Sequence, residues 1–159
     1  MENKDCAPSS EIKMHLRCYR EREDVGAVLH AHPPVATGFA VANIPLDDYS
    51  MIETVISLGS VPVTPYGTPS TEEVPEAIAP YLADHDAMLL QNHGALVVGP
   101  DIIGAYYRME TLELFAQISL NAKITRRCQG TFSPEYRPSD LYERAVSGYG
   151  QTSGISEIS

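Results

Sequence analysis

The segment Val28–Pro34, with the sequence VLHAHPP, constrains the fold most, because it combines a short apolar run, two histidines and two prolines. The apolar run is typical of a β-strand, and prolines end a strand because they have no backbone N–H to donate. Residues i and i+2 of a strand point to the same face, so His30 and His32 are expected to project side by side. That geometry suits two imidazole ligands of one metal ion. A His-x-His pair alone does not separate a metal site from an ordinary pair of core or surface histidines.

Length, composition and net charge limit the classes of protein to which the chain can belong. The chain has 159 residues, 43% of them hydrophobic and 20% charged, which is ordinary for one globular domain with a buried core. A net charge of −10 argues against nucleic acid or an anionic membrane surface as a partner. No apolar run approaches the roughly 18 residues that span a bilayer. Three cysteines without a metal-binding spacing, and a polar N-terminus without a signal-peptide core, predict a cytoplasmic protein.

Short helices and strands are expected to alternate along the chain, which predicts an α/β fold whose sheet is not purely parallel. One domain is expected over residues 9–127, between an unstructured N-terminus at 1–8 and a C-terminal tail at 128–159 with a short helix at 139–147. Helices are expected from Ser9 or Ser10 to the charged run at 20–24, and at 35–42, 50–57, 72–84 and 101–123. Strands are expected at 25–32, 61–63, 87–91 and 95–98.

The tripeptide at 92–94, Asn-His-Gly, lies between two apolar runs and predicts a tight hairpin or bulge. Its central residue, His93, therefore stands at a strand end, as His30 and His32 do. Three imidazoles suit zinc and leave one position open for water or substrate. A nearby carboxylate could be a fourth ligand or a general base, and composition and spacing leave Glu11 as one candidate among many.

The residues at the start of the first expected helix have two interpretations. Ser9 or Ser10 can act as the N-cap, and Glu11 in the first turn can complement the helix dipole. Alternatively, free N–H groups at a helix N-terminus, with two hydroxyl groups beside them, can bind a phosphate group. The residues alone leave both interpretations open.

Together these motifs resemble the class II aldolase/adducin-head family, of the zinc-dependent fuculose-phosphate aldolase type. The resemblance covers most of residues 8–125, and its motifs follow the order and spacing of the family. The matching segments are Ser9-Ser10-Glu11, His30-Ala31-His32 with Pro33-Pro34, Ile44-Pro45 leading to Tyr49, and Leu90-Gln91-Asn92-His93-Gly94.

The resemblance implies a fold and a metal site. The fold would be a mixed, largely antiparallel central sheet flanked by helices, an α/β/α sandwich, in a homotetramer. Its metal would be Zn²⁺, held by His30, His32 and His93. Glu11 would fill the fourth position at rest and act as acid or base when substrate displaces it.

The resemblance also implies residues that contact the substrate. Ser9 and Ser10 would form part of a site for the phosphate group. Tyr49 would supply a proton from a neighbouring subunit, and Tyr149 would reach toward the site from the C-terminal tail. The implied reaction cleaves a phosphorylated ketose, such as fuculose 1-phosphate, into dihydroxyacetone phosphate and a small aldehyde.

Other members of the family carry out other chemistry. The same scaffold serves 4-epimerases, a dehydratase and non-catalytic adducin heads. A glutamate at position 11 argues against the epimerases, and three intact histidines argue against adducin. Family members carry a longer segment before the Ser-Ser-Glu motif, so the chain is expected to be N-terminally truncated, with an unpaired sheet edge and an incomplete phosphate site. A degenerate, non-catalytic subunit is therefore the alternative.

Overall fold

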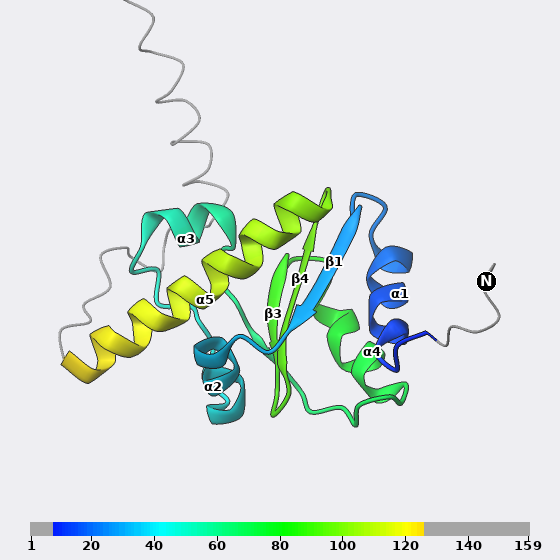
Figure 1. Cartoon of the computed structure of the whole chain (residues 1–159), viewed down its shortest axis with the longest axis horizontal. Helices are drawn as coiled ribbons and strands as arrows, with labels where there is room; N and C mark the ends of the chain where they lie inside the picture. The colour runs from blue at the N-terminus through cyan, green and yellow to red at the C-terminus, as the bar shows by residue number, and fades with distance from the viewer. Residues whose placement is uncertain (1–7, 126–159) are drawn as a thin grey trace, which may run out of the picture.

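The computed structural model describes residues 8–125, which form one sheet between two layers of helices (Figure 1). The four strands stand in the order β1-β4-β3-β2. Strand β4 is antiparallel to β1 and β3, and β2 is parallel to β3, so the predicted mixed, largely antiparallel sheet is confirmed. The strands are β1 (Ala27–Ala31), β2 (Val63–Thr64), β3 (Ala87–Leu90) and β4 (Gly94–Gly99).

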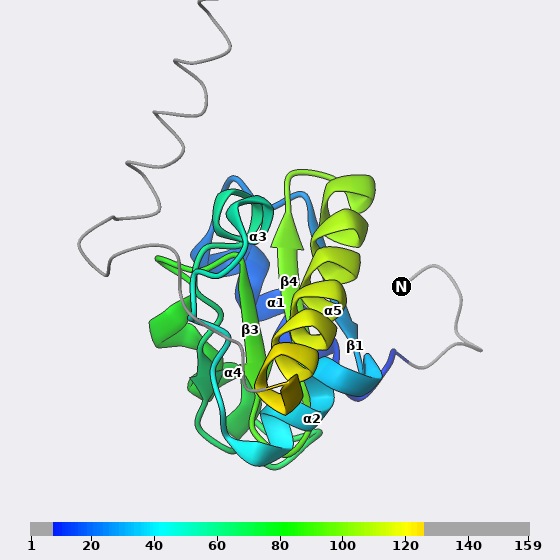
Figure 2. The ribbon, with the colours of Figure 1, turned by 90° about the vertical axis from the view of Figure 1, so that its left-hand side faces the viewer.

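Helices cover both faces of the sheet. Helices α1 and α4 lie on one face, and α2, α3 and α5 lie on the other, as Figures 1 and 2 show from two directions. This arrangement confirms the α/β/α sandwich. Within residues 8–125, no helix is both long and apolar enough to cross a membrane. The helices are α1 (Ile12–Glu21), α2 (Pro34–Ala42), α3 (Ile52–Ser57), α4 (Glu73–Ile78), the 3₁₀ helix η1 (Ala79–Tyr81) and α5 (Ile102–Thr125).

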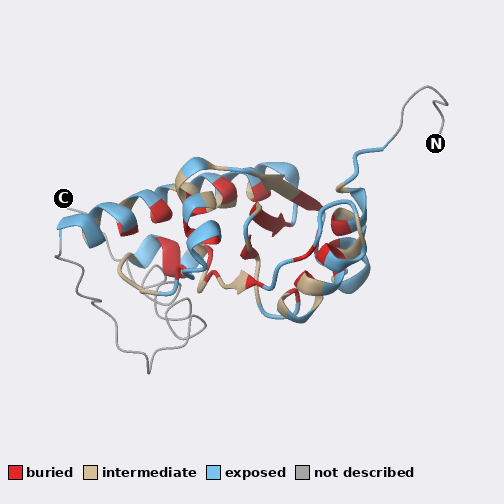
Figure 3. Ribbon diagram, turned by 90° about the horizontal axis from the view of Figure 1, so that it is seen from below, coloured by how far each residue is buried: buried red, intermediate tan, exposed pale blue. Residues whose placement is uncertain are grey.

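Successive side chains of a strand point to opposite faces of the sheet, so the molecule has two hydrophobic cores, one on each face. In β4, Ala95 and Val97 face α2 and α5, whereas Leu96 and Val98 face α1 and α4. Since both faces of the sheet are covered, β3 and β4 are buried along their whole length, and Figure 3 shows this burial in the interior. The central strands are therefore continuous apolar runs rather than alternating ones.

Helix α1 forms where its apolar spacing predicts it, but a different side of it faces the core. Ile12, Leu16 and Tyr19 set the helical period, yet their side chains are 38%, 40% and 42% exposed. Met14 and Cys18 pack against the sheet instead, with exposures of 1% and 0%. The periodicity therefore identified the helix but not its buried face.

Two elements differ from their predicted bounds because of proline. The helix expected over 72–84 is divided into α4 and η1, since Pro80 has no N–H to donate to the carbonyl four residues earlier. The strand expected at 61–63 starts later, as β2, and Val61 forms only an isolated bridge with Leu46. The predicted tail helix lies outside the described residues, and the predicted domain limits stay a prediction.

Candidate metal centre

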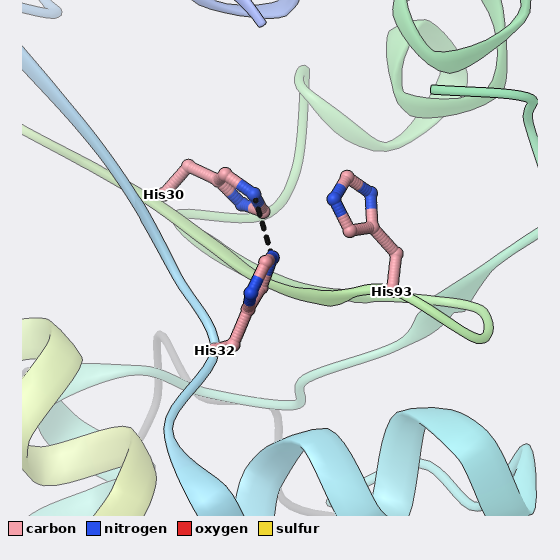
Figure 4. A group of neighbouring side chains, drawn as sticks. All are labelled: His30, His32 and His93. Atoms are coloured by element: carbon pink, nitrogen blue, oxygen red, sulfur yellow. Dashed lines mark hydrogen bonds between the residues drawn. The ribbon is translucent and has the colours of Figure 1, made fainter.

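Three imidazole rings converge at one end of the sheet (Figure 4). His30 lies in β1, His32 lies one residue beyond the end of β1, and His93 lies in the turn between β3 and β4. The distances between ring centroids are 4.7 to 5.1 Å. One ring nitrogen of each residue lies within 4.8 Å of those of the other two, which is a grouping that could hold a metal ion.

The turn between β3 and β4 brings His93 to the other two histidines. Leu90 pairs with Gly94, so residues 91–93 form a three-residue connection in which the N–H of His93 bonds to the carbonyl of Leu90 at 3.0 Å. Asn92 has φ 56°, in the left-handed region that asparagine tolerates better than most residues. Because β4 also pairs with β1, this turn lies beside the end of β1, and the predicted hairpin is confirmed.

A backbone carbonyl fixes the tautomer of His30. Its Nδ1 lies 2.9 Å from the carbonyl oxygen of Ala95, which can only accept a hydrogen bond. Nδ1 of the neutral ring therefore carries the proton, and the lone pair of Nε2 is left to accept a hydrogen bond from Nε2 of His32 or to bind a metal ion. Metal-binding histidines are typically held in this way, with the second ring nitrogen donating to a carbonyl or carboxylate.

The spacing of two nitrogens fits a metal ion. Nε2 of His30 and Nε2 of His32 lie 3.2 Å apart. Two ligands of a tetrahedral zinc ion with Zn–N bonds of about 2.0–2.1 Å would be about 3.3 Å apart. In addition, Nδ1 of His93 is buried without a hydrogen-bond partner in the described part of the chain. Buried polar atoms normally have partners, so this nitrogen is a candidate ligand atom.

A glycine makes room for the second ring. A Cβ atom on Gly94 would lie 2.3 Å from Cδ2 of His32 and 2.7 Å from the carbonyl oxygen of Ala31. The imidazole of His32 therefore lies directly over a position without a side chain. Because His32 is itself exposed, this contact and the backbone on either side decide where its ring lies.

Burial favours the neutral form of two of the imidazoles. Burial lowers the pKa of His30, and the nearby rings of His93 and His32 lower it further, against the opposing effects of Ala95 and Glu11. Burial also lowers the pKa of His93, while the negative charge of Glu11 acts to raise it. A neutral imidazole is the form that binds metal, so the site favours the ligand state.

The Ser-Ser-Glu motif lies near the histidines without joining them. Glu11 is half-buried and acts electrostatically on His30 and His93, but its carboxylate is outside the three-histidine group. Glu11 rather than a serine is the N-cap residue of α1. Ser9 instead accepts the N–H of Glu11 through Oγ at 3.3 Å, and Ser10 is exposed in the turn before the helix.

Only one of the two predicted tyrosines lies within the described residues. Tyr49 is half-buried in the segment between α2 and α3, with φ 34°, a backbone conformation that is uncommon for a side chain of its size. Tyr149 lies outside the described residues. The roles predicted for both tyrosines therefore stay predictions.

Sequence reasoning missed the residues that hold the histidines in place. The carbonyl of Ala95 orients His30, and the missing side chain of Gly94 accommodates His32. Gly94 had a local signal, because it directly follows a histidine in a turn. Ala95 had none, because a backbone carbonyl is present at every position and only the strand register selects this one.

Three comparisons with known proteins agree with this fold. A curated 5-deoxy-D-ribulose 1-phosphate aldolase from Bacillus thuringiensis is 33% identical over 147 residues, covering 91% of this chain and 66% of the relative. A 3-oxo-tetronate 4-phosphate decarboxylase from Escherichia coli is 34% identical over 116 residues, covering 70% of this chain and 54% of the relative. A solved L-fuculose 1-phosphate aldolase superposes with a TM-score of 0.78 and 31% identity, covering 87% of this chain and 64% of that chain.

The chain spans between about half and two thirds of the length of the curated relatives it matches. Over residues 1–120 it matches the family model described as the class II aldolase and adducin N-terminal domain. That match includes every strand of the sheet and all three converging histidines, so the chain belongs to the class II aldolase and adducin N-terminal domain family.

Proposed function

We propose that this chain supplies the metal site of an aldehyde-lyase that cleaves a phosphorylated ketose. The products would be dihydroxyacetone phosphate and a small aldehyde, and fuculose 1-phosphate is the ketose to test first. The convergence of three imidazoles, with the tautomer of His30 set by Ala95, is the observation that carries the proposal. Relatives named as fuculose-phosphate and deoxyribulose-phosphate aldolases support it.

Zinc is the proposed metal, with His30, His32 and His93 as its ligands. Three neutral imidazoles with an open fourth position are typical of catalytic zinc, although ligand type alone leaves other divalent metals as competitors. When bound, the ion would act as a Lewis acid on the carbonyl oxygen of the substrate. The histidines themselves orient that ion and, being neutral, leave the site with a net positive charge that attracts an anionic substrate.

Glu11 is proposed as the acid or base of the reaction and as the fourth ligand at rest. Cleavage of a C–C bond next to a hydroxyl group requires one proton to leave that hydroxyl and one to reach the carbon released. Glu11 is half-buried, and its negative charge acts to raise the pKa of His30 and of His93, which supports this role. Tyr49 is proposed to exchange the proton on the oxygen of the aldehyde fragment.

The substrate's phosphate group is proposed to bind near the start of α1. Ser9 and Ser10 are both exposed there, beside Glu11, and their hydroxyl groups can donate to phosphate oxygens. Tyr149 is proposed to approach from the C-terminal tail. We also propose that the protein is cytoplasmic and assembles as a homotetramer, which light scattering on the purified protein would test.

Zinc analysis of the purified chain tests the metal site. We expect one zinc ion per chain in the parent and loss of it in His30→Ala. His85→Ala is the matched control, because His85 bonds to the carbonyl of Ser60 and is not part of the histidine group. Undiminished zinc in His30→Ala would rule out the site.

Two assays test the chemistry. Release of dihydroxyacetone phosphate from fuculose 1-phosphate is expected for the parent and not for Glu11→Ala. Full activity of Glu11→Ala would exclude its role. The similarity to a decarboxylase makes decarboxylation of a 3-oxo-acid phosphate the second candidate, which carbon dioxide release without an aldehyde product would identify. Zinc binding without turnover of any sugar phosphate would favour a non-catalytic subunit.

A further inference from the structure

Helix α2 follows the second histidine of the VLHAHPP segment and lacks a conventional cap. A helix leaves up to four backbone N–H groups without an intrahelical partner at its N-terminus. Pro33 and Pro34 have no N–H, and the N-cap residue has no side chain that could bond to the helix. The N–H of Thr37 already bonds to the carbonyl of Pro33 at 2.8 Å. Only the N–H groups of Val35 and Ala36 therefore need a partner from elsewhere.

The carboxylate of Glu113, on α5, satisfies both groups. It accepts the N–H of Val35 at 3.1 and 3.2 Å through its two oxygens, and the N–H of Ala36 at 2.9 Å. Gln117, one turn further along α5, donates to the same carboxylate at 3.1 Å. A negative charge at a helix N-terminus also interacts favourably with the helix dipole. Glu113 thus caps α2 from another helix.

This cap lies close to His32 along the chain. Val35 is three residues after His32, and the two intervening prolines have fixed φ angles, which makes the connection stiff. On the other side, Ala31 is held in the sheet by pairing with Ala95. The backbone of His32 is therefore held between the end of β1 and the first turn of α2, and the bonds to Glu113 help to fix that first turn.

We infer that Glu113 is a positioning residue for His32 and, through it, for the metal ion. The inference rests on the proposed function, because it concerns the affinity for that metal. His32 needs such support more than His30, since its ring is exposed and bonds to no carbonyl among the described residues, whereas His30 bonds to the carbonyl of Ala95. Without the carboxylate, the first turn of α2 loses the bonds that fix it, and we expect the ring of His32 to shift with that turn.

Two variants and one control test the inference. Glu113→Ala removes the hydrogen bonds to both N–H groups, and Glu113→Gln keeps one acceptor oxygen but loses the charge. Glu110→Gln is the matched control, because Glu110 lies one turn away on α5, is exposed, and within residues 8–125 bonds only to Tyr106 of the same helix. Zinc affinity would be measured by competition with a chromophoric chelator, and Co²⁺ absorption would report the geometry of the site.

A metal-free measurement separates this inference from the proposed function. Amide exchange at Val35 and Ala36 reports the cap, and the ¹H–¹⁵N resonances of the His32 ring report its position. We expect zinc affinity to fall by about tenfold in Glu113→Gln and further in Glu113→Ala, with a changed Co²⁺ spectrum and shifted His32 resonances. Glu110→Gln is expected to match the parent in every measurement.

Each outcome decides the inference. Unchanged His32 resonances and zinc affinity in both Glu113 variants, with only a lower melting temperature, would overturn it, because the carboxylate would then stabilise α2 alone. If Glu113→Ala does not fold, Glu113→Gln decides by the same measurements. If the parent binds no zinc, the proposed metal site fails, and the His32 resonances of the metal-free variants still decide whether Glu113 positions the ring.

Discussion

Substitution of Gly94 by alanine should disrupt the proposed metal site, because the Cβ atom that it adds collides with the ring of His32. The added Cβ would lie 2.3 Å from Cδ2 of His32 and 2.7 Å from the carbonyl oxygen of Ala31, whereas ordinary contacts begin at 3.4 Å. The carbonyl cannot withdraw easily, because Ala31 pairs with Ala95 in the sheet. The His32 ring must therefore move by at least about 1 Å, which exceeds the tolerance of about 0.2 Å in a metal–nitrogen distance.

The loss of zinc affinity should be large. Changing groups that merely orient a ligand typically costs 10- to 100-fold in metal affinity. Here the ligand itself is displaced, so we expect a loss of about 100-fold, or about 2.7 kcal/mol. Crowding against the backbone should also lower the free energy of unfolding of the metal-free protein by about 1–3 kcal/mol.

Zinc titration by chelator competition, with urea unfolding of the metal-free protein, would measure both effects. Gly38→Ala is the matched control, because Gly38 is exposed in α2 and a Cβ there would meet nothing within 4 Å. That control should bind zinc as the parent does, and its free energy of unfolding should rise by up to about 1 kcal/mol, since alanine favours a helix more than glycine does. A Gly94→Ala protein that folds and binds zinc as tightly as the parent would refute the reasoning.

Three further substitutions or reactions test other parts of the structure. Asp86 forms ion pairs with Arg22 and Arg108 at 2.6 and 2.7 Å, at the end of β3 opposite the histidines. Asp86→Asn should therefore lower the free energy of unfolding in urea by about 2 kcal/mol without changing zinc affinity. Burial raises the pKa of Cys18 to about 12, so in a folded variant whose other cysteines are replaced by serine its thiol should resist alkylation. Its contribution to the free energy of unfolding should be complete below about pH 9 and should be lost as the pH rises toward 12. Asn92 has φ 56°, a backbone conformation that alanine tolerates less well than asparagine, so Asn92→Ala should lower the free energy of unfolding by about 1 kcal/mol. Asn92→Gly should leave the free energy of unfolding unchanged.

The two histidine motifs could be predicted because their causes are local, whereas bringing them together requires the pairing of β1 with β4. The i, i+2 spacing of His30 and His32 gives same-side projection at a strand end, even though β1 stops at Ala31. The turn around His93 is specified by its neighbours Asn92 and Gly94. These patterns depend on a few consecutive residues, so they survived errors of one or two positions in the element bounds.

The buried faces of the helices could not be predicted from apolar spacing alone. In α5, Ile103, Tyr107 and Leu114 set a helical period, but their side chains are 57%, 61% and 50% exposed. Phe115 and Leu112 on the other side are 1% and 0% exposed and fill the core. As in α1, the helix carries apolar side chains on two sides, and a single period cannot indicate which side meets the sheet.

The supports of the site have the opposite character to the histidine motifs, because they depend on contacts between distant residues. Ala95 is 65 positions from His30, and Glu113 is 78 positions from Val35. The Ala95 contact follows once the register of β1 and β4 is known, since pairing of Ala31 with Ala95 places that carbonyl beside the end of β1. The Glu113 contact requires, in addition, the rotation of α5 about its own axis, which the apolar pattern of α5 leaves undecided. The proposed chemistry of the site therefore lies in short motifs, whereas on our inference the position of the His32 ring depends on how α5 packs against α2.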